Sequence, residues 1–150
     1  MVTSGLPGHR RRGFTLIEVL VVIVVIAILS MLVIPRAMAA RRTAKEAVLR
    51  GNLKQLRDAI MRFEGMTAAW PPSLPDIMAA NGDAVSGDTD GEGGQVDRMA
   101  YDGPYLLTGD GTLPKDPFTG AADWAYDNST GAVHSSAGLS AIDRSAYRTW

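Results

Sequence analysis

The feature that most constrains this chain is an unbroken apolar run at residues 14–34, in which only Thr15, Glu18 and Ser30 are not plainly apolar. A helix of this length spans about 31 Å at ~1.5 Å per residue, close to the hydrocarbon thickness of a bilayer. The β-branched stretch at residues 21–26 favours a strand in water. In lipid the backbone must satisfy its hydrogen bonds internally, so we predict a membrane-spanning helix.

Residues 1–13 precede this run and carry three arginines but no acidic residue. A secretory signal peptide also begins with a basic segment, but it has a shorter apolar core followed by a small-residue cleavage site. Here the run ends at Pro35, and only the alanines beyond it offer such a site. Residues 1–13 are expected to be disordered or removed, and a signal-peptide cut after Ala39 is the alternative. Basic residues flank the run on both sides, so charge does not orient it.

The helical pattern continues beyond the apolar run. Pro35 is expected to kink or loosen the helix, because it has no N–H for the carbonyl of Met31. Over residues 36–64, large apolar side chains then recur at spacings of four, three, four and three, which places them on one face: Leu49, Leu53, Leu56, Ile60 and Phe63. We predict an amphipathic helix continuous with the membrane segment and ending near Gly65.

Residues 65–150 have the composition of a small head domain rich in proline and glycine. We expect a short helix at 74–80 and short strands at 101–107 and near Tyr147. The clearest β signal is a hairpin, with strands at 123–126 and 132–135 around a loop that contains Gly131. The predicted fold is therefore α+β, with one long N-terminal helix packed on a small antiparallel sheet.

Charge is segregated along the chain. Residues 36–64 carry eight basic and three acidic residues, a net charge of +5, whereas residues 65–150 carry four basic and twelve acidic ones, a net charge of −8. A basic stem beside an acidic head suggests contacts between copies, and two solvated faces are the alternative. The chain has no cysteine, which excludes disulfides and thiolate metal sites.

The N-terminal motif is the most specific signal. Residues 13–18 read Gly-Phe-Thr-Leu-Ile-Glu and follow three arginines. This resembles the class III leader of type IV pilins and pseudopilins, and the match covers residues 10–35, including Pro35 inside the helix. The resemblance implies cleavage after Gly13 by a prepilin peptidase and N-methylation of Phe14. It also implies one inner-membrane span, with a head in the periplasm or outside the cell, and later incorporation into a filament.

Glu18 stands inside the apolar helix, where a carboxylate is costly and usually functional. In a filament of packed helices, the cation available to it is the free amine of Phe14 on a neighbouring copy. An unpaired buried charge costs several kcal/mol, so this pairing would set the axial register between subunits. The alternative is that the Glu18 carboxylate reaches the lipid headgroups.

The head shows a second, weaker resemblance. It combines Gly-Pro-Tyr at 103–105, Pro-Lys-Asp-Pro at 114–117 and Trp124-x-Tyr126, and it lacks a C-terminal cysteine pair. This resembles the major, G-type pseudopilins of type II secretion systems. Trp124 and Tyr126 share a strand face and are expected to pack on the stem helix. Any small β-meander with a proline-rich entry is the alternative.

One glycine-rich loop concentrates oxygen ligands that suit Ca²⁺: Asp88, Asp90, Glu92 and Asp97. It begins as an EF-hand loop does, but Met99 stands where the final glutamate belongs. The pseudopilins that the chain resembles hold Ca²⁺ nearer the C-terminus, where this chain offers little beyond Asp143. A solvated acidic loop is the alternative.

Enzyme chemistry is poorly supported, because the two histidines, His9 and His134, have no catalytic partners in sequence and no nucleophile, phosphate or zinc motif is present.

We predict a structural subunit of a homo-oligomeric type IV pilus-like filament, most like a type II secretion pseudopilus that pushes substrates across the outer membrane. Its implied partners are prepilin peptidase, the inner-membrane assembly platform and minor pseudopilins. A pilus subunit for adhesion, motility or DNA uptake, or an anchored binding module, is the alternative. The acidic head argues against nucleic-acid binding.

Overall fold

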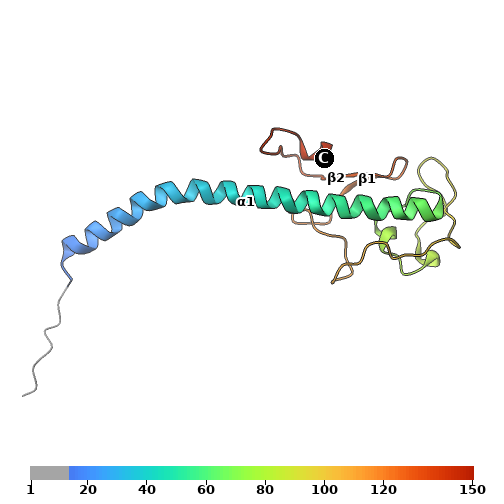
Figure 1. The fold of residues 1–150 in the computed structure, drawn as a ribbon, viewed down its shortest axis with the longest axis horizontal. Coiled ribbons are helices and arrows are strands. Elements are labelled where there is room, and N and C mark those ends of the chain that lie inside the picture. Colours follow the sequence, from blue (N-terminus) through green and yellow to red (C-terminus); the bar gives the residue numbers. More distant parts are fainter. Residues whose placement is uncertain (1–13) are drawn as a thin grey trace, which may run out of the picture. The chain divides into compact units, whose positions relative to one another are not determined.

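The computed structural model describes residues 14–150, apart from the side chains of Leu32, Ile34 and Pro35. The predicted leader at residues 1–13, with its cleavage residue Gly13, lies outside the described residues. The expected α+β class, with a long helix and a small antiparallel sheet, is confirmed. In chain order, the elements drawn in Figure 1 are α1 (Leu16–Thr67), η1 (Leu74–Met78), η2 (Gly82–Ala84), β1 (Ala125–Asp127), β2 (Ala132–His134) and η3 (Tyr147–Thr149).

Helix α1 is continuous through position 35, as predicted for the apolar and amphipathic segments together. It contributes to two compact units, Met1–Ala40 and Arg41–Trp150. In the first unit, every described large apolar side chain from Phe14 to Val33 is exposed. By length and composition this helix could cross a membrane. Such an apolar surface is tolerable only in lipid or against other protein, because it is far larger than a soluble monomer leaves in water.

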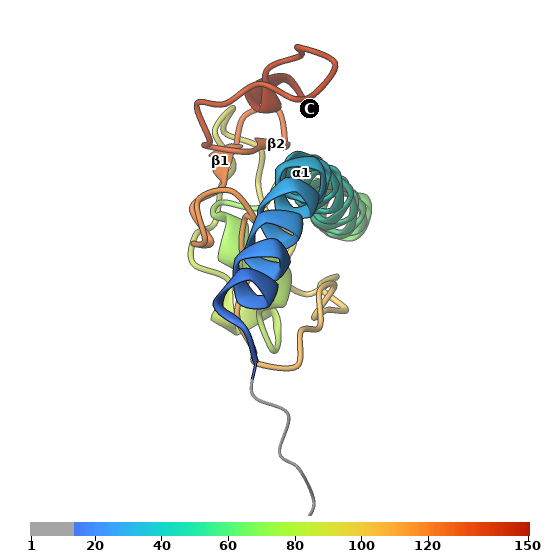
Figure 2. The ribbon, with the colours of Figure 1, turned by 90° about the vertical axis from the view of Figure 1, so that its left-hand side faces the viewer.

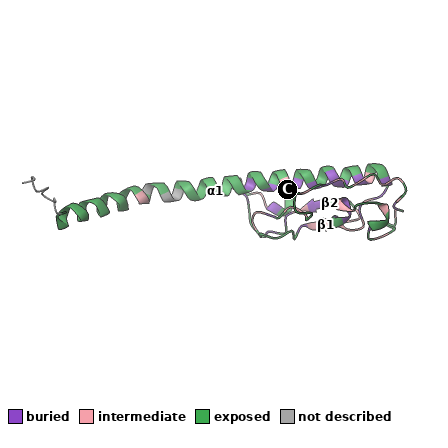
Figure 3. Cartoon of the chain, turned by 90° about the horizontal axis from the view of Figure 1, so that it is seen from below, coloured by how far each residue is buried: buried purple, intermediate pink, exposed green. Residues whose placement is uncertain are grey.

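In the unit Arg41–Trp150, one face of α1 carries the core. Figure 3 shows the buried positions recurring along this part of the helix, and Figure 2 shows that the head covers only part of its circumference. The predicted stripe is confirmed, and none of its five side chains is more than 2% exposed: Leu49, Leu53, Leu56, Ile60 and Phe63. Burying each such side chain contributes about 1.5–3 kcal/mol, so this stripe is the main source of the head's stability.

The helix ends two residues beyond the predicted stop at Gly65. Its last residue is Thr67, and Ala68 then takes the left-handed conformation with φ of 60°. The Thr67 hydroxyl donates to the carbonyls of Phe63 and Ala69, at 2.8 and 3.2 Å, and holds this reversal in place. The helix therefore continues past Gly65, because the packing of Phe63 and the buried bonds of Thr67 outweigh the low helix propensity of glycine.

The hairpin is confirmed, with Tyr126 paired to Val133 in an antiparallel register. Its strands are shorter and shifted from the prediction, so Trp124 lies just before β1. The strand expected at 101–107 is wrong, because the N–H groups of Tyr105 and Leu106 both donate to the carbonyl of Ile77 rather than to a neighbouring strand. The strand expected near Tyr147 is also wrong, since that segment forms the 3-10 helix η3.

Candidate assembly site

The first turn of α1 is capped by a residue next to the predicted processing point. The backbone carbonyl of Thr15 accepts the N–H groups of Glu18 and Val19, at 3.1 and 3.3 Å, and its hydroxyl also accepts the N–H of Glu18, at 3.4 Å. Thr15 is therefore the N-cap, and Glu18 is the third residue of the helix. The sequence analysis did not assign a role to Thr15, although Thr-x-x-Glu is a recognised capping pattern.

Glu18 is exposed in the single chain, and its carboxylate is available to a partner. Among residues 14–150, no basic group lies within ion-pair distance of it. Both Phe14 and Glu18 lie beside large apolar side chains that are exposed, such as Leu16 at 85% and Ile17 at 69%. An acid on such a surface becomes expensive once the surface is buried, unless a cation accompanies it.

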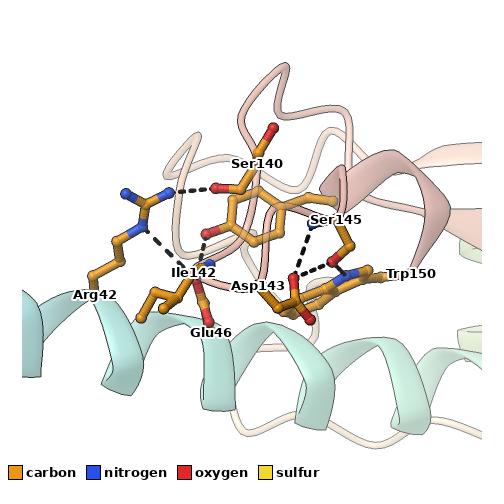
Figure 4. A network of polar contacts seen from close by, with 8 residues as sticks. Arg42, Glu46, Ser140, Ile142, Asp143, Ser145 and Trp150 are labelled. Atoms are coloured by element: carbon orange, nitrogen blue, oxygen red, sulfur yellow. Dashed lines mark hydrogen bonds and ion pairs between the residues drawn. The ribbon is translucent and has the colours of Figure 1, made fainter.

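A second polar cluster joins the C-terminal segment to the stem (Figure 4). Glu46 is only 8% exposed. Its Oε1 accepts the hydroxyl of Tyr147 at 2.9 Å and the N–H of Ile142 at 2.9 Å. Arg42, one turn earlier, lies 3.7 Å from the same oxygen and also donates to the carbonyl of Ser140. One stem carboxylate thus binds two points of the last eleven residues, and Arg42 binds a third.

The end of the chain carries its own bonds beside this cluster. The N–H of Ser145 donates to Asp143 at 2.9 Å, and the indole N–H of Trp150 donates to the Ser145 hydroxyl at 2.6 Å. Hydrogen bonds from the hydroxyl and the N–H of Ser145 lower the pKa of Asp143. Burial, followed by the bond to Glu46, raises the pKa of Tyr147. This phenol therefore stays protonated in the physiological pH range and donates its hydrogen bond there.

Sequence reasoning missed Glu46, although its signal was present. The residue precedes Leu49 by three, so it continues the spacing of the buried stripe and lies on the core-facing side of α1. An acidic side chain at a core-facing position needs hydrogen-bond donors to compensate its burial. Tyr147 and the backbone of Ile142, about a hundred residues later, supply them, and a local pattern does not identify partners at that distance.

Replacing Glu46 with alanine is expected to lower the free energy of unfolding by about 2–4 kcal/mol, because the buried hydroxyl of Tyr147 and the part-buried N–H of Ile142 lose their acceptor. The measurement is thermal unfolding of the full chain in detergent. Glu46→Gln keeps an acceptor oxygen and should lose less than the alanine variant. Asp58→Ala, on the exposed side of the same helix, is the matched control. Equal stability of Glu46→Ala and the control would contradict this assignment.

The Pro-Lys-Asp-Pro sequence also has a structural explanation. Asp116 is fully buried. Its carboxylate accepts the N–H of Phe118 at 2.7 Å and the hydroxyl of Ser135, while its backbone carbonyl accepts the N–H of Gly120. The motif therefore closes a turn and ties it to the exit of the hairpin. Trp124 is also buried, and its indole N–H donates to the carbonyl of Pro114 at 2.7 Å.

Three of the four carboxylates considered for Ca²⁺ contact different partners. Asp90 accepts the N–H groups of Trp70, Glu92 and Gly94, at 3.3, 3.0 and 2.6 Å. The carboxylate of Asp88 pairs with Arg98 at 2.7 Å, and that of Asp97 accepts backbone N–H groups just after it. In the part of the chain that the structure describes, no three acidic or histidine side chains are grouped so as to hold a metal ion. The same holds near Asp143, whose carboxylate is bonded to Ser145.

Calcium binding at the acidic loop stays a prediction, which a melting experiment can test. Stabilisation by a ligand follows its concentration relative to its dissociation constant. If the loop binds Ca²⁺, adding it should raise the melting temperature of the full chain, and Asp88→Asn combined with Glu92→Gln should abolish the rise. Asp58→Asn, which removes a carboxylate outside the loop, is the control. An unchanged melting temperature after chelation would dismiss the ion.

Comparison with known proteins finds a family model that matches the N-terminal motif. A family model described as the prokaryotic N-terminal methylation motif matches residues 8–34. The chain is 34% identical over 71 residues to the type II secretion system core protein G of Pseudomonas aeruginosa, covering 47% of this chain and 50% of that protein. It is 38% identical over 75 residues to core protein G of Pectobacterium carotovorum, covering 50% of this chain and 48% of that protein.

A pilus protein is similar over a shorter stretch. The type IV wide pilus major component PilA4 of Thermus thermophilus is 46% identical over 55 residues, which cover 37% of this chain and 39% of that protein. No solved structure matches the chain. The chain spans about half the length of the core protein G relatives that it matches. It carries the prokaryotic N-terminal methylation motif and is similar to core protein G of type II secretion systems.

Proposed function

We propose that this chain is a structural subunit of a type IV pilus-like filament, and specifically of a type II secretion pseudopilus. The observation that carries the proposal is an apolar helix whose described large apolar side chains are all exposed before Pro35, with one carboxylate three positions into it. Such a helix can serve first as a membrane anchor and then as the core of a filament. The relatives named core protein G support the choice of a secretion system.

In this proposal the chain is first anchored in the inner membrane by residues 14–35, with its head on the periplasmic side. A prepilin peptidase removes residues 1–13 and methylates the amine of Phe14. The assembly platform then lifts the mature chain from the membrane, and minor pseudopilins accompany it. The basic segment before the helix and the methylation motif over residues 8–34 support this sequence of events.

The role that we infer is mechanical rather than catalytic. The relatives are named as a core protein of a secretion system and as a component of a pilus. In the head, the buried carboxylates of Asp76 and Asp116 accept hydrogen bonds that hold loops together. This use of buried acids serves the rigidity of the head, which a filament under load requires.

Deletion of the gene in its host, followed by complementation, tests the proposal. The periplasm, the culture medium and sheared surface filaments are assayed for accumulated secretion substrates and for pili. Substrates trapped in the periplasm while pili are retained would support a secretion pseudopilus. Loss of pili with normal secretion would support a type IV pilus, which the similarity to PilA4 makes the second candidate. Unchanged secretion and unchanged pili would contradict a filament role.

A further inference from the structure

A hollow surface on the head lies between α1 and the C-terminal segment and is distinct from the N-terminal site. It consists of two adjoining hollows with volumes of about 420 and 550 Å³, which share Arg57, Met61 and Trp150. We name it the basic groove and define it by six residues that line it: Arg50, Lys54, Arg57, Met61, Arg148 and Trp150.

The basic groove combines an apolar floor with four cations. Met61 is 64% exposed, and Trp150 is half-buried beside it. The guanidinium of Arg50 lies 4.2 Å from the centre of the Trp150 ring, and Arg57 donates to the carbonyl of Val133 at 3.0 Å, so two cations are held in position. Among the described residues, none of the groove's four cations forms an ion pair.

The net charge of the groove is positive even when the neighbouring acids are counted. Asp58 lines one of the two hollows, and Asp143 interacts electrostatically with Arg50, so four basic side chains stand against two acids, a net charge of +2. Cations fixed over an apolar floor favour an anionic partner, because part of their desolvation and ordering cost is already met. The groove therefore fits an acidic segment rather than a basic or neutral one.

The same chain offers such a segment at another place. The acidic loop, residues 86–97, carries four acids and no basic residue. It is held in shape by Asp90, which accepts three backbone N–H groups, and by a bridge between Thr89 and Gln95. The carboxylate of Asp88 is 80% exposed although it pairs with Arg98, and Glu92 is also exposed. A rigid loop with outward carboxylates loses little entropy on binding.

The acidic loop and the basic groove of one chain lie at different levels along α1. The loop is bonded to the end of the helix, where the N–H of Asp97 donates to the carbonyl of Thr67 at 3.0 Å. Lys54 precedes Thr67 by thirteen residues, which is about 20 Å along the axis. A loop can therefore reach the level of Lys54 most readily from a second copy displaced along the helix direction.

We propose that the acidic loop of one copy docks into the basic groove of the next, an inference that rests on the proposed filament. Groove and loop are different surfaces, so their contact is heterologous, and a heterologous contact that does not close into a ring generates an open filament. Helices held together in the filament core raise the effective concentration of neighbouring heads, so a modest electrostatic contact is sufficient.

Site-directed crosslinking in assembled filaments tests this contact. The chain has no cysteine, so introduced thiols have no background. Two differently tagged full-length copies are produced together, one with Lys54→Cys and the other with Glu92→Cys, and treated with a short bismaleimide. The matched control pairs Glu92→Cys with Arg62→Cys, an exposed basic residue of α1 that lines a different hollow. We expect about tenfold more crosslinked dimer from the first pair than from the control.

The outcomes separate this contact from the filament itself. Filaments with no excess of the 54–92 crosslink would overturn the docking and leave the proposed function standing. A crosslink from the Lys54→Cys variant to a different protein, in place of a second copy, would overturn the second copy as occupant. No filament from the unmodified chain would overturn both. In a second arm, Glu92→Lys and Lys54→Glu should each lower filament yield, and the two together in one chain should restore it. Absence of this rescue would also overturn the docking.

Discussion

Replacement of Glu18 with alanine is expected to leave membrane insertion unchanged and to reduce the yield of sheared filaments by about tenfold or more. The apolar helix keeps its length, so its transfer into lipid is not impaired. In the filament, the amine of Phe14 on the adjacent copy would lose its partner, and an unpaired buried charge costs several kcal/mol. Since every 1.4 kcal/mol changes an equilibrium tenfold, even partial loss of this pair is visible in the yield.

The control for Glu18 is another polar residue of the same apolar run. Ser30→Ala removes a polar side chain from the helix without removing a charge, so it should assemble normally. Glu18→Asp keeps the charge on a shorter side chain and should retain part of the yield. Membrane fractionation confirms insertion for all three variants. Filaments from Glu18→Ala at the unmodified yield would remove the register role of this carboxylate.

The second large effect is expected at Phe63, the last apolar residue of the buried stripe. Phe63 is fully buried, and its ring packs edge-on against Tyr101 and Tyr105, with centroid distances of 5.6 and 6.1 Å. Phe63→Ala removes the centre of this cluster, and we expect a loss of about 3–5 kcal/mol in unfolding free energy. In a head of this size, such a loss lowers the melting temperature by roughly 10–20 °C.

Near-ultraviolet circular dichroism of the full chain in detergent measures this effect, because it follows aromatic packing rather than the helix content of the membrane segment. Met66→Ala is the matched control, since Met66 lies one turn away on α1 and is 47% exposed. It should change the unfolding free energy by less than about 0.5 kcal/mol. Equal melting temperatures for the two variants would mean that the aromatic cluster does not hold the head on the stem.

The helical half of the fold was predictable because its signals are local and repeated. The spacing from Leu49 to Phe63 determines a face of α1 whatever the rest of the chain does. The hairpin was predictable for the same reason, since its turn residues lie between two short apolar segments. The bounds of β1 and β2 were not, because strands of three residues depend on neighbouring contacts such as the bond from the Tyr126 hydroxyl to the carbonyl of Pro71.

The rest of the head was less predictable because its order comes from distant partners. The segment at Tyr147 resembles a strand by composition. The hydroxyl of Tyr147 donates to Glu46, however, and the segment forms the 3-10 helix η3. The acidic loop resembles a metal site by composition, and Ca²⁺ binding there stays a prediction; the carboxylates of Asp88, Asp90 and Asp97 bind Arg98 or backbone N–H groups. Glu46 lies about a hundred residues from Tyr147, too far for a local pattern to identify. The partners of the loop carboxylates lie mostly within ten residues, but they are largely backbone N–H groups, which residue type alone does not reveal.

The most direct test of the filament account is the mass of the N-terminal peptide of the native protein purified from membranes. The account requires a free amine at Phe14, one helical turn from Glu18, and that amine exists only if residues 1–13 are removed. Mass spectrometry is expected to find a mature chain that begins with N-methylated Phe14. A chain that retains Met1, or one that is cut after Ala39, would contradict the account.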